Sequence, residues 1–183
     1  MTNKRPKYKT PGLPKAQGHM ALWCREGLLD QPKDIAKSVK WAQKAAVGGD
    51  ANGQYLLAVS YQNGEAGMEK NFRAASEWYE KVANQEDMEW TSYAMVNNGA
   101  LYALGGPGLD PCRKSAAIWF QKSAGRGLRA GSRFFAECLY RGFGVQLNLE
   151  EARRRFESAA MFRHSIFDTE AKYKLAIMKI RGE

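Results

Sequence analysis

The chain has 183 residues, of which 44% are hydrophobic and 11% aromatic, so it can form a folded domain with a substantial core and is too apolar for a disordered polymer. No apolar run approaches the roughly 18 residues that a membrane-spanning helix needs, which predicts no membrane insertion. The formal net charge of +9 directs attention to acidic partners.

The N-terminal segment is basic. Residues 1–16 hold five basic residues and no acidic one, and together with several prolines this predicts a flexible basic tail over residues 1–12. No apolar segment follows that could serve as a signal peptide. The three cysteines, Cys24, Cys112 and Cys138, form an odd set without a CxxC pair. These features together predict a cytoplasmic protein with reduced thiols.

A segment with a tryptophan at its centre recurs along the chain. It covers residues 37–46, returns at 74–83 and 115–124, and has a fainter copy at 151–160, where Arg155 replaces the tryptophan. The copies are about 40 residues apart, a period typical of helix-turn-helix repeats. One such unit cannot bury its apolar face alone, so we expect the copies to stack on one another.

Each copy has the pattern of an amphipathic helix. Small and apolar residues fall three or four apart, as in Ala75, Trp78 and Val82, and we expect Trp78 to be the buried anchor of its repeat. A residue that can cap the helix precedes three of the copies: Asp34, Asn71 and Asn148. Another amphipathic stretch comes before each copy and ends at a glycine, most clearly over residues 51–64.

The recurring motif resembles a known family. The residues that carry the resemblance are Gly49-Asp50-Ala51, Tyr55, Leu57, Tyr61, Asn63-Gly64, Gly67, Asn71, Trp78-Tyr79 and Lys81-Val82-Ala83. They look like the Sel-one-like repeat (SLR), a relative of the tetratricopeptide repeat, and the resemblance covers roughly residues 14–182. It implies an all-α fold, a right-handed α-solenoid of about four and a half helix-turn-helix repeats.

The resemblance also sets the expected boundaries. The solenoid would cover residues 13–183, with repeats at about 14–49, 50–86, 87–127 and 128–164 and a half repeat at 165–183. The first helices would cover residues 14–27, 51–64, 92–106, 129–142 and 169–182. One position in these helices is always small, which predicts close helix packing there: Ala21, Ala58, Gly99, Ala136 and Ala176. Lys179 replaces a family tyrosine in the half repeat, which suits an end cap.

No residues converge into a predicted active site. The two histidines, His19 and His164, would lie far apart in a linear solenoid, and the cysteines are expected to be small packing residues. The glycine-rich residues 105–108 lack the Gly-Lys-Ser/Thr of a phosphate loop and are expected to form a repeat turn. Adjacent Glu150 and Glu151 would point about 100° apart on a helix. We therefore predict no catalytic residue, metal or cofactor.

A second basic cluster leaves an alternative open. Arg153-Arg154-Arg155, Arg163 and His164, together with the tail, could contact nucleic acid or another acidic surface. A solvated helix face is the preferred interpretation, because no nucleic-acid motif accompanies the cluster. Nucleic-acid binding and the regulation of an enzyme remain as alternatives.

By resemblance, the function is that of a non-catalytic protein-interaction scaffold, often an adaptor in bacterial signalling, secretion or envelope assembly. The first helices would line a concave groove that holds a peptide or a partner domain. The residues expected to line it are Leu22, Arg25, Asn52, Tyr55, Val59, Gln62, Val96, Ala100, Arg133, Glu137, Tyr140, Arg141, Tyr173, Ile177 and Arg181. Its mixture of arginines and aromatics predicts an acidic or C-terminal peptide segment with an apolar anchor.

Overall fold

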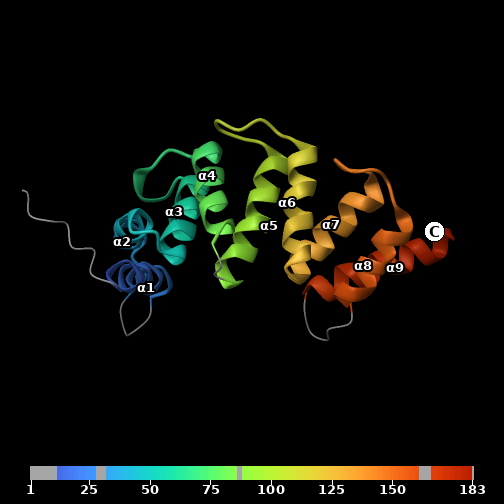
Figure 1. Cartoon of the computed structure of the whole chain (residues 1–183), viewed down its shortest axis with the longest axis horizontal. Helices are drawn as coiled ribbons and strands as arrows, with labels where there is room; N and C mark the ends of the chain where they lie inside the picture. The colour runs from blue at the N-terminus through green and yellow to red at the C-terminus, as the bar shows by residue number, and fades with distance from the viewer. Residues whose placement is uncertain (1–11, 28–31, 86–87, 161–165, 183) are drawn as a thin grey trace, which may run out of the picture. The chain divides into compact units, whose positions relative to one another are not determined.

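The computed structural model describes residues 12–27, 32–85, 88–160 and 166–182 (Figure 1). Within these ranges the regular structure is helical, apart from an isolated β-bridge between Gly106 and Leu109. The predicted all-α solenoid of repeats is therefore confirmed. The predicted tail lies outside the described residues except for Gly12. None of the described helices combines the length and the apolar character that crossing a membrane requires.

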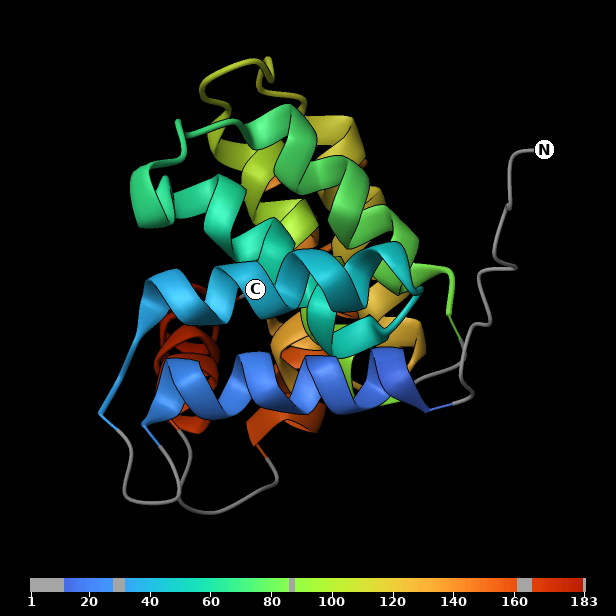
Figure 2. The ribbon, with the colours of Figure 1, turned by 90° about the vertical axis from the view of Figure 1, so that its left-hand side faces the viewer.

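The chain divides into two compact units, and the first, unit 1, comprises residues 1–87. Its helices are α1 (Leu13–Glu26), α2 (Ile35–Val47), α3 (Ala51–Asn63), the short 3-10 helix η1 (Glu65–Gly67) and α4 (Phe72–Ala83). Consecutive α-helices pack against each other, as α1 and α2 show in Figure 2. The core between the first three helices is built from Ala21, Ala42, Ala46, Leu56 and Leu57.

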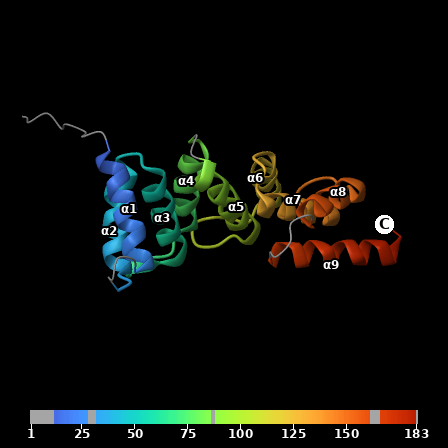
Figure 3. The same ribbon diagram turned by 90° about the horizontal axis from the view of Figure 1, so that it is seen from below.

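Unit 2 comprises residues 88–183. Its helices are α5 (Met88–Leu104), α6 (Arg113–Gly125), α7 (Arg129–Arg141), α8 (Leu149–Ala160) and α9 (Ile166–Arg181). Consecutive helices again pack together, and α9 also contacts α7 (Figure 3). Aromatic side chains contribute more to this core than to that of unit 1: Phe120, Phe135 and Phe156 are all buried.

The helix starts follow the predicted caps. The side chains of Asp34, Asn71 and Asn148 each accept a hydrogen bond from the backbone N–H three residues later, at 2.8 to 2.9 Å. The backbone N–H of each cap also donates to a carbonyl near the end of the preceding first helix, as Asn71 does to Tyr61 at 2.9 Å. Cys112 takes the same place before α6 without a side-chain cap. The cap residue thus begins one helix and ties it to the other.

The small position of the first helices is buried in four repeats. Ala21, Ala58 and Ala136 have no exposed surface, and Gly99 is buried as well. A Cβ on Gly99 would lie 2.6 Å from Cε1 of Phe120, so only glycine fits beneath that ring. The prediction was wrong for Ala176, which is exposed on α9, because no further helix in the described part of the chain covers it.

Trp78 is not the fully buried anchor that the sequence predicted for its repeat. Trp78 is only partly buried, and the next residue, Tyr79, is completely buried instead. The third repeat shows the same pattern: Phe120, the residue after Trp119, is buried in the core. Trp41, Trp78 and Trp119 are partly buried on α2, α4 and α6. Each is covered by a lysine three residues later, with Nζ to ring-centroid distances of 4.8, 3.7 and 4.4 Å.

Candidate functional site

The residues predicted to bind a partner lie on the first helices, as expected, and they divide between the two units. Unit 1 contributes Leu22 and Arg25 on α1 and Asn52, Tyr55, Val59 and Gln62 on α3. Unit 2 contributes Val96 and Ala100 on α5, Arg133, Glu137, Tyr140 and Arg141 on α7, and Tyr173, Ile177 and Arg181 on α9. Most of these side chains are partly or fully exposed. Asn52 is buried, with only 8% of its surface exposed.

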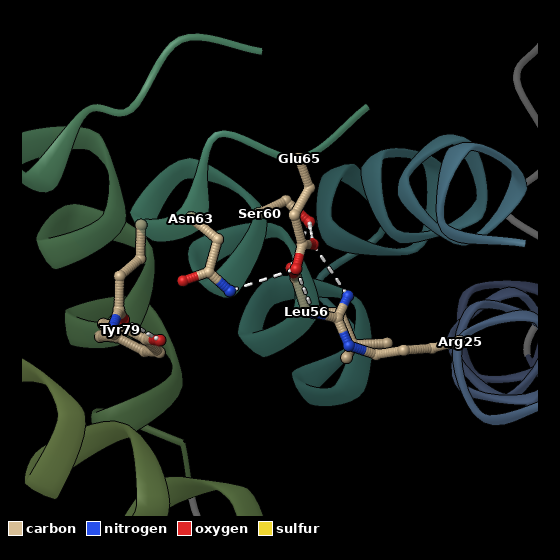
Figure 4. Close-up of polar contacts among 7 residues, drawn as sticks. Arg25, Leu56, Ser60, Asn63, Glu65 and Tyr79 are labelled. Carbon is tan, nitrogen blue, oxygen red and sulfur yellow. Dashed lines mark hydrogen bonds and ion pairs between the residues drawn. The ribbon is translucent and has the colours of Figure 1, made fainter. Parts of the chain in front are cut away.

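In unit 1, Arg25 of α1 and Glu65 of η1 form an ion pair that joins the first two repeats (Figure 4). Two hydrogen bonds connect them, from Nη1 to Oε2 at 3.0 Å and from Nη2 to Oε1 at 2.6 Å. Ser60 Oγ lies 3.0 Å from the same carboxylate, and the Asn63 amide donates to it at 3.1 Å. Arg25 was predicted to meet a partner's carboxylate, yet it already binds one from its own chain.

The environment of Glu65 keeps it ionised. Burial would raise the pKa of Glu65, but the hydrogen bonds from Arg25, Asn63 and Ser60 and the charge of Arg25 outweigh burial, so this pKa lies below the usual 4.5. The carboxylate and the guanidinium are therefore both charged at neutral pH. Their side chains are only 16% and 17% exposed, which shields the pair from solvent screening.

Two more predicted residues of unit 1 are tied to α4. The phenol of Tyr79 donates a hydrogen bond to Gln62 Oε1 at 2.8 Å, and its ring centroid lies 5.7 Å from that of Tyr55. Tyr55 and Gln62 therefore support the packing of α3 on α4. Their exposed parts are available to a partner, but their positions are set by the core.

In unit 2 a pocket of about 310 Å³ opens between α5, α6 and α7; we name it the phenylalanine pocket. Its apolar lining consists of Ala100, Ala103, Leu104, Phe120, Phe134 and Phe143. Glu137, Cys138 and Arg141 complete it. Phe120 and Phe134 stack with their ring centroids 4.9 Å apart, and Leu104 is 77% exposed at the edge. The pocket is open to solvent.

Cationic side chains surround the pocket. Glu137 pairs with Arg141 on its own helix and with Lys174 of α9, whose Nζ lies 3.2 Å from Oε1. The guanidinium of Arg133 lies 4.1 Å from the centroid of Phe134, and that of Arg113 lies 5.2 Å from that of Phe143. Further along α9, Arg181 donates to the hydroxyl of Tyr140 at 3.0 Å. The positive charge of this face exceeds its negative charge.

The three cysteines are poorly placed for nucleophilic chemistry, because two are buried and the third has no histidine beside it among the described residues. Burial, with a smaller contribution from the charge of Glu137, raises the pKa of Cys138 to about 11, so this thiol stays protonated at neutral pH. Cys24 is buried in α1. Cys112 is partly exposed, and the Ser115 hydroxyl 3.1 Å from its sulfur lowers the pKa of its thiol, but no histidine contacts it within the described residues.

The other candidate residues gather into no site. His19 packs near Trp23, with ring centroids 6.4 Å apart, while Arg163 and His164 lie outside the described residues. The three consecutive arginines of α8 pair with acids of the same helix: Arg153 with Glu157, Arg154 with Glu150 and Glu151, and Arg155 with Glu151. Among the described residues, no group of three or more His, Cys, Asp or Glu is placed to hold a metal ion.

The sequence did not reveal the phenylalanine pocket, although it predicted Ala100, Glu137 and Arg141. It missed Phe120, Phe134 and Phe143, which lie on a second helix, on the inner side of α7 and in the loop after it. One signal was present: Gly99 stands where the other repeats carry alanine, and a glycine there admits a large ring from the second helix. The size of the cavity could not follow from the spacing of residues alone.

Comparison with known proteins assigns the family. The Sel1 repeat matches residues 14–50, 51–87, 92–128 and 130–161, and the chain belongs to the Sel1 repeat family. A protective antigen of uropathogenic Escherichia coli strains with an SLR fold is similar over 93% of this chain and 34% of its own, at 29% identity and a TM-score of 0.79. A Sel1 repeat protein from Oxalobacter formigenes is similar over 90% of this chain and 63% of its own, at 27% identity and a TM-score of 0.73.

The chain therefore spans about a third and somewhat under two thirds of these two solved chains. Sel1 repeat proteins generally serve as protein-interaction scaffolds and are typically not catalysts. The repeats therefore assign the family and the fold of this chain.

Proposed function

We propose that this chain is a non-catalytic scaffold that holds an acidic or C-terminal peptide segment of a partner protein on its first-helix faces. The observation that carries the proposal is the charge of α7 and α9. Among the side chains that the structure describes on this face, the cations Arg133, Arg141, Lys174 and Arg181 outnumber the single carboxylate of Glu137. Arginine pairs bidentately with carboxylate, so the face suits an acidic segment.

Unit 2 is the better candidate for this role. In unit 1 the guanidinium of Arg25 is committed to Glu65, whereas the side chain of Arg141 in unit 2 remains 62% exposed beside its partner. The arginines of α8 form ion pairs along their own helix, which gives the alternative of nucleic-acid binding less support.

A peptide-display selection tests this function directly. Random peptides displayed on phage would be selected against the purified chain, and the enriched sequences synthesised and measured by isothermal titration calorimetry. We expect enrichment of Asp and Glu. The double variant Arg141→Ala with Arg181→Ala should weaken binding of the selected peptides by about tenfold or more, which corresponds to about 1.4 kcal/mol.

The matched control removes the same charge elsewhere. Arg153→Ala with Arg154→Ala also deletes two exposed arginines from unit 2, but on α8, and it should change the affinity by less than about twofold. Failure to select any peptide, or equal weakening by both double variants, would overturn the proposed site on α7 and α9. Turnover of a substrate by the chain would overturn the assignment as a non-catalytic scaffold.

A further inference from the structure

The ion pair of unit 1 and the pocket of unit 2 occupy the same place in the repeat. Trp119 lies 78 residues after Trp41 (119 − 41 = 78), and the same offset takes Gly64, at the end of α3, to Gly142, at the end of α7 (142 − 64 = 78), so it relates the two units as far as the loop that follows these glycines. It takes Arg25 to Ala103 (103 − 25 = 78) and Glu65 to Phe143 (143 − 65 = 78). The two residues that meet across this space in unit 1 are thus replaced by two lining residues of the phenylalanine pocket.

The neighbours follow the same correspondence. Ser60 and Asn63, which contact the Glu65 carboxylate, correspond to Cys138 and Arg141, which line the pocket. A guanidinium and a carboxylate occupy the space in unit 1, whereas a methyl group and an aromatic ring border it in unit 2. The pocket is therefore a position where this chain has exchanged a closing ion pair for an apolar recess.

The recess has the dimensions and the chemistry of a side-chain subsite. Its volume of about 310 Å³ is at the lower end of the range of ligand pockets, so it suits one amino-acid side chain better than a cofactor. Stacked Phe120 and Phe134 form an aromatic wall, and the exposed Leu104 extends the apolar surface to solvent. An aromatic or branched aliphatic side chain would find apolar contacts here and no unpaired polar partner.

The charges around the recess favour particular residues next to the inserted side chain in the partner's sequence. Arg113 stacks on Phe143, Arg133 on Phe134, and Arg141 and Lys174 pair with Glu137. Around the recess, these four cations therefore outnumber the one carboxylate, Glu137, among the side chains that the structure describes. Residues on either side of an inserted apolar side chain would therefore be favoured as Asp or Glu.

The geometry points to the phenylalanine pocket as the anchor subsite of this scaffold, which takes one phenylalanine or leucine side chain from an acidic segment of a partner protein. This inference rests on the proposed function, because the acidic segment is the ligand proposed for α7 and α9. It adds the specificity: unit 2 distinguishes among acidic segments by their apolar residue.

The test compares two synthetic peptides with blocked ends, Asp-Glu-Phe-Glu-Asp and Asp-Glu-Ala-Glu-Asp, by NMR titration of the full chain. We expect the phenylalanine peptide to bind at least about fivefold more tightly and to shift the ring signals of Phe134 and Phe143. The double variant Ala103→Arg with Phe143→Glu transfers the ion pair of unit 1 into unit 2 without changing the net charge. In this variant we expect the two peptides to bind equally.

Two further variants complete the design. Ile118→Arg with Leu147→Glu introduces the same charges at exposed apolar residues outside the pocket lining and should keep the preference for phenylalanine. Ala100→Leu fills the pocket with the side chain that its counterpart Leu22 carries in unit 1, and it should abolish the preference if the double variant fails to fold.

The outcomes separate this inference from the function on which it rests. Equal binding of both peptides to the unaltered chain would overturn the anchor subsite and leave the acidic-segment scaffold standing. A preference for phenylalanine that survives both pocket variants would place the anchor elsewhere and overturn the inference. Binding of neither peptide would overturn both proposals for unit 2.

Discussion

The guanidinium of Arg25 holds both carboxylate oxygens of Glu65, at 3.0 and 2.6 Å, between the first two repeats of unit 1. Because this carboxylate is hydrogen bonded and paired, the pKa of Glu65 is lowered in the folded state. A group whose pKa is lower when folded stabilises the fold above its unfolded pKa and loses that contribution as the pH falls through its folded pKa.

Arg25→Ala should therefore destabilise unit 1 by about 1 to 3 kcal/mol at pH 7, since it leaves a partly buried carboxylate without its cation. The difference from the unaltered chain should shrink as the pH falls below the ordinary value of 4.5, where Glu65 becomes protonated in the unfolded chain and then in the folded one. Thermal unfolding followed by circular dichroism across this range of pH measures the difference in stability.

The control is Arg153→Ala, which removes an exposed ion pair of α8 and should cost less than about 1 kcal/mol both at pH 7 and at low pH. A destabilisation independent of pH would contradict the prediction.

Tyr79 should matter more to stability than the tryptophan beside it. Tyr79 has no exposed surface and donates a hydrogen bond to Gln62, so Tyr79→Ala should cost about 3 to 5 kcal/mol. Trp78→Ala should cost less, about 1 to 3 kcal/mol, because part of the indole is already solvated. Urea unfolding of the two variants decides their order, and Tyr79→Phe isolates the hydrogen bond at about 1 kcal/mol. A greater loss from Trp78→Ala would restore the tryptophan as the anchor of the repeat.

The small position of the first helices should tolerate enlargement only where no helix covers it. Ala58→Leu adds a branched side chain at a site with no exposed surface, and overpacking there should cost about 1 to 3 kcal/mol. Ala176→Leu makes the same change at an exposed site of α9 and should alter stability by less than about 0.5 kcal/mol. Melting temperatures of the two variants test the contrast, and similar shifts in both would argue against the packing described for α3.

Asn98 is a fully buried amide whose nitrogen and oxygen have no hydrogen-bond partner among the described residues. The corresponding positions of the neighbouring repeats hold apolar Leu57 and Phe135. Asn98→Leu should therefore raise the free energy of unfolding by about 1 to 3 kcal/mol, because it removes the cost of burying an unsatisfied amide and keeps the same branched shape. Asn98→Asp, which buries a charge instead, should destabilise the chain. A fall in melting temperature for the leucine variant would show that the amide has a favourable partner.

The fold followed from the sequence because the helix boundaries depend on local chemistry. The caps Asp34, Asn71 and Asn148 and the glycines that end the first helices act within a few residues of themselves, and a repeated pattern shows them several times. The choice between Trp78 and Tyr79 for the core was harder, since both lie near the apolar face of α4 and only the neighbouring helices decide which one is covered.

The candidate site was only partly accessible to the same reasoning. Exposed residues of one helix face, such as Glu137 and Arg141, follow from helical spacing. The phenylalanine pocket depends on a loop residue, a second-helix ring and the absence of an ion pair that another repeat possesses. Comparing each residue with its counterpart in the other repeats, and asking which charged pair has been lost, is the step that would have located it.

The lysines that cover Trp41, Trp78 and Trp119 also give the chain built-in optical reporters. Each indole lies partly in water beneath an ammonium group, so iodide, an anionic quencher, is drawn to it more strongly than the neutral quencher acrylamide is. When a repeat opens, its lysine and tryptophan separate, and the advantage of iodide disappears for that indole alone. Chains that retain only one of the five tryptophans, at position 41, 78 or 119, would then record the opening of individual repeats by fluorescence, without any attached dye.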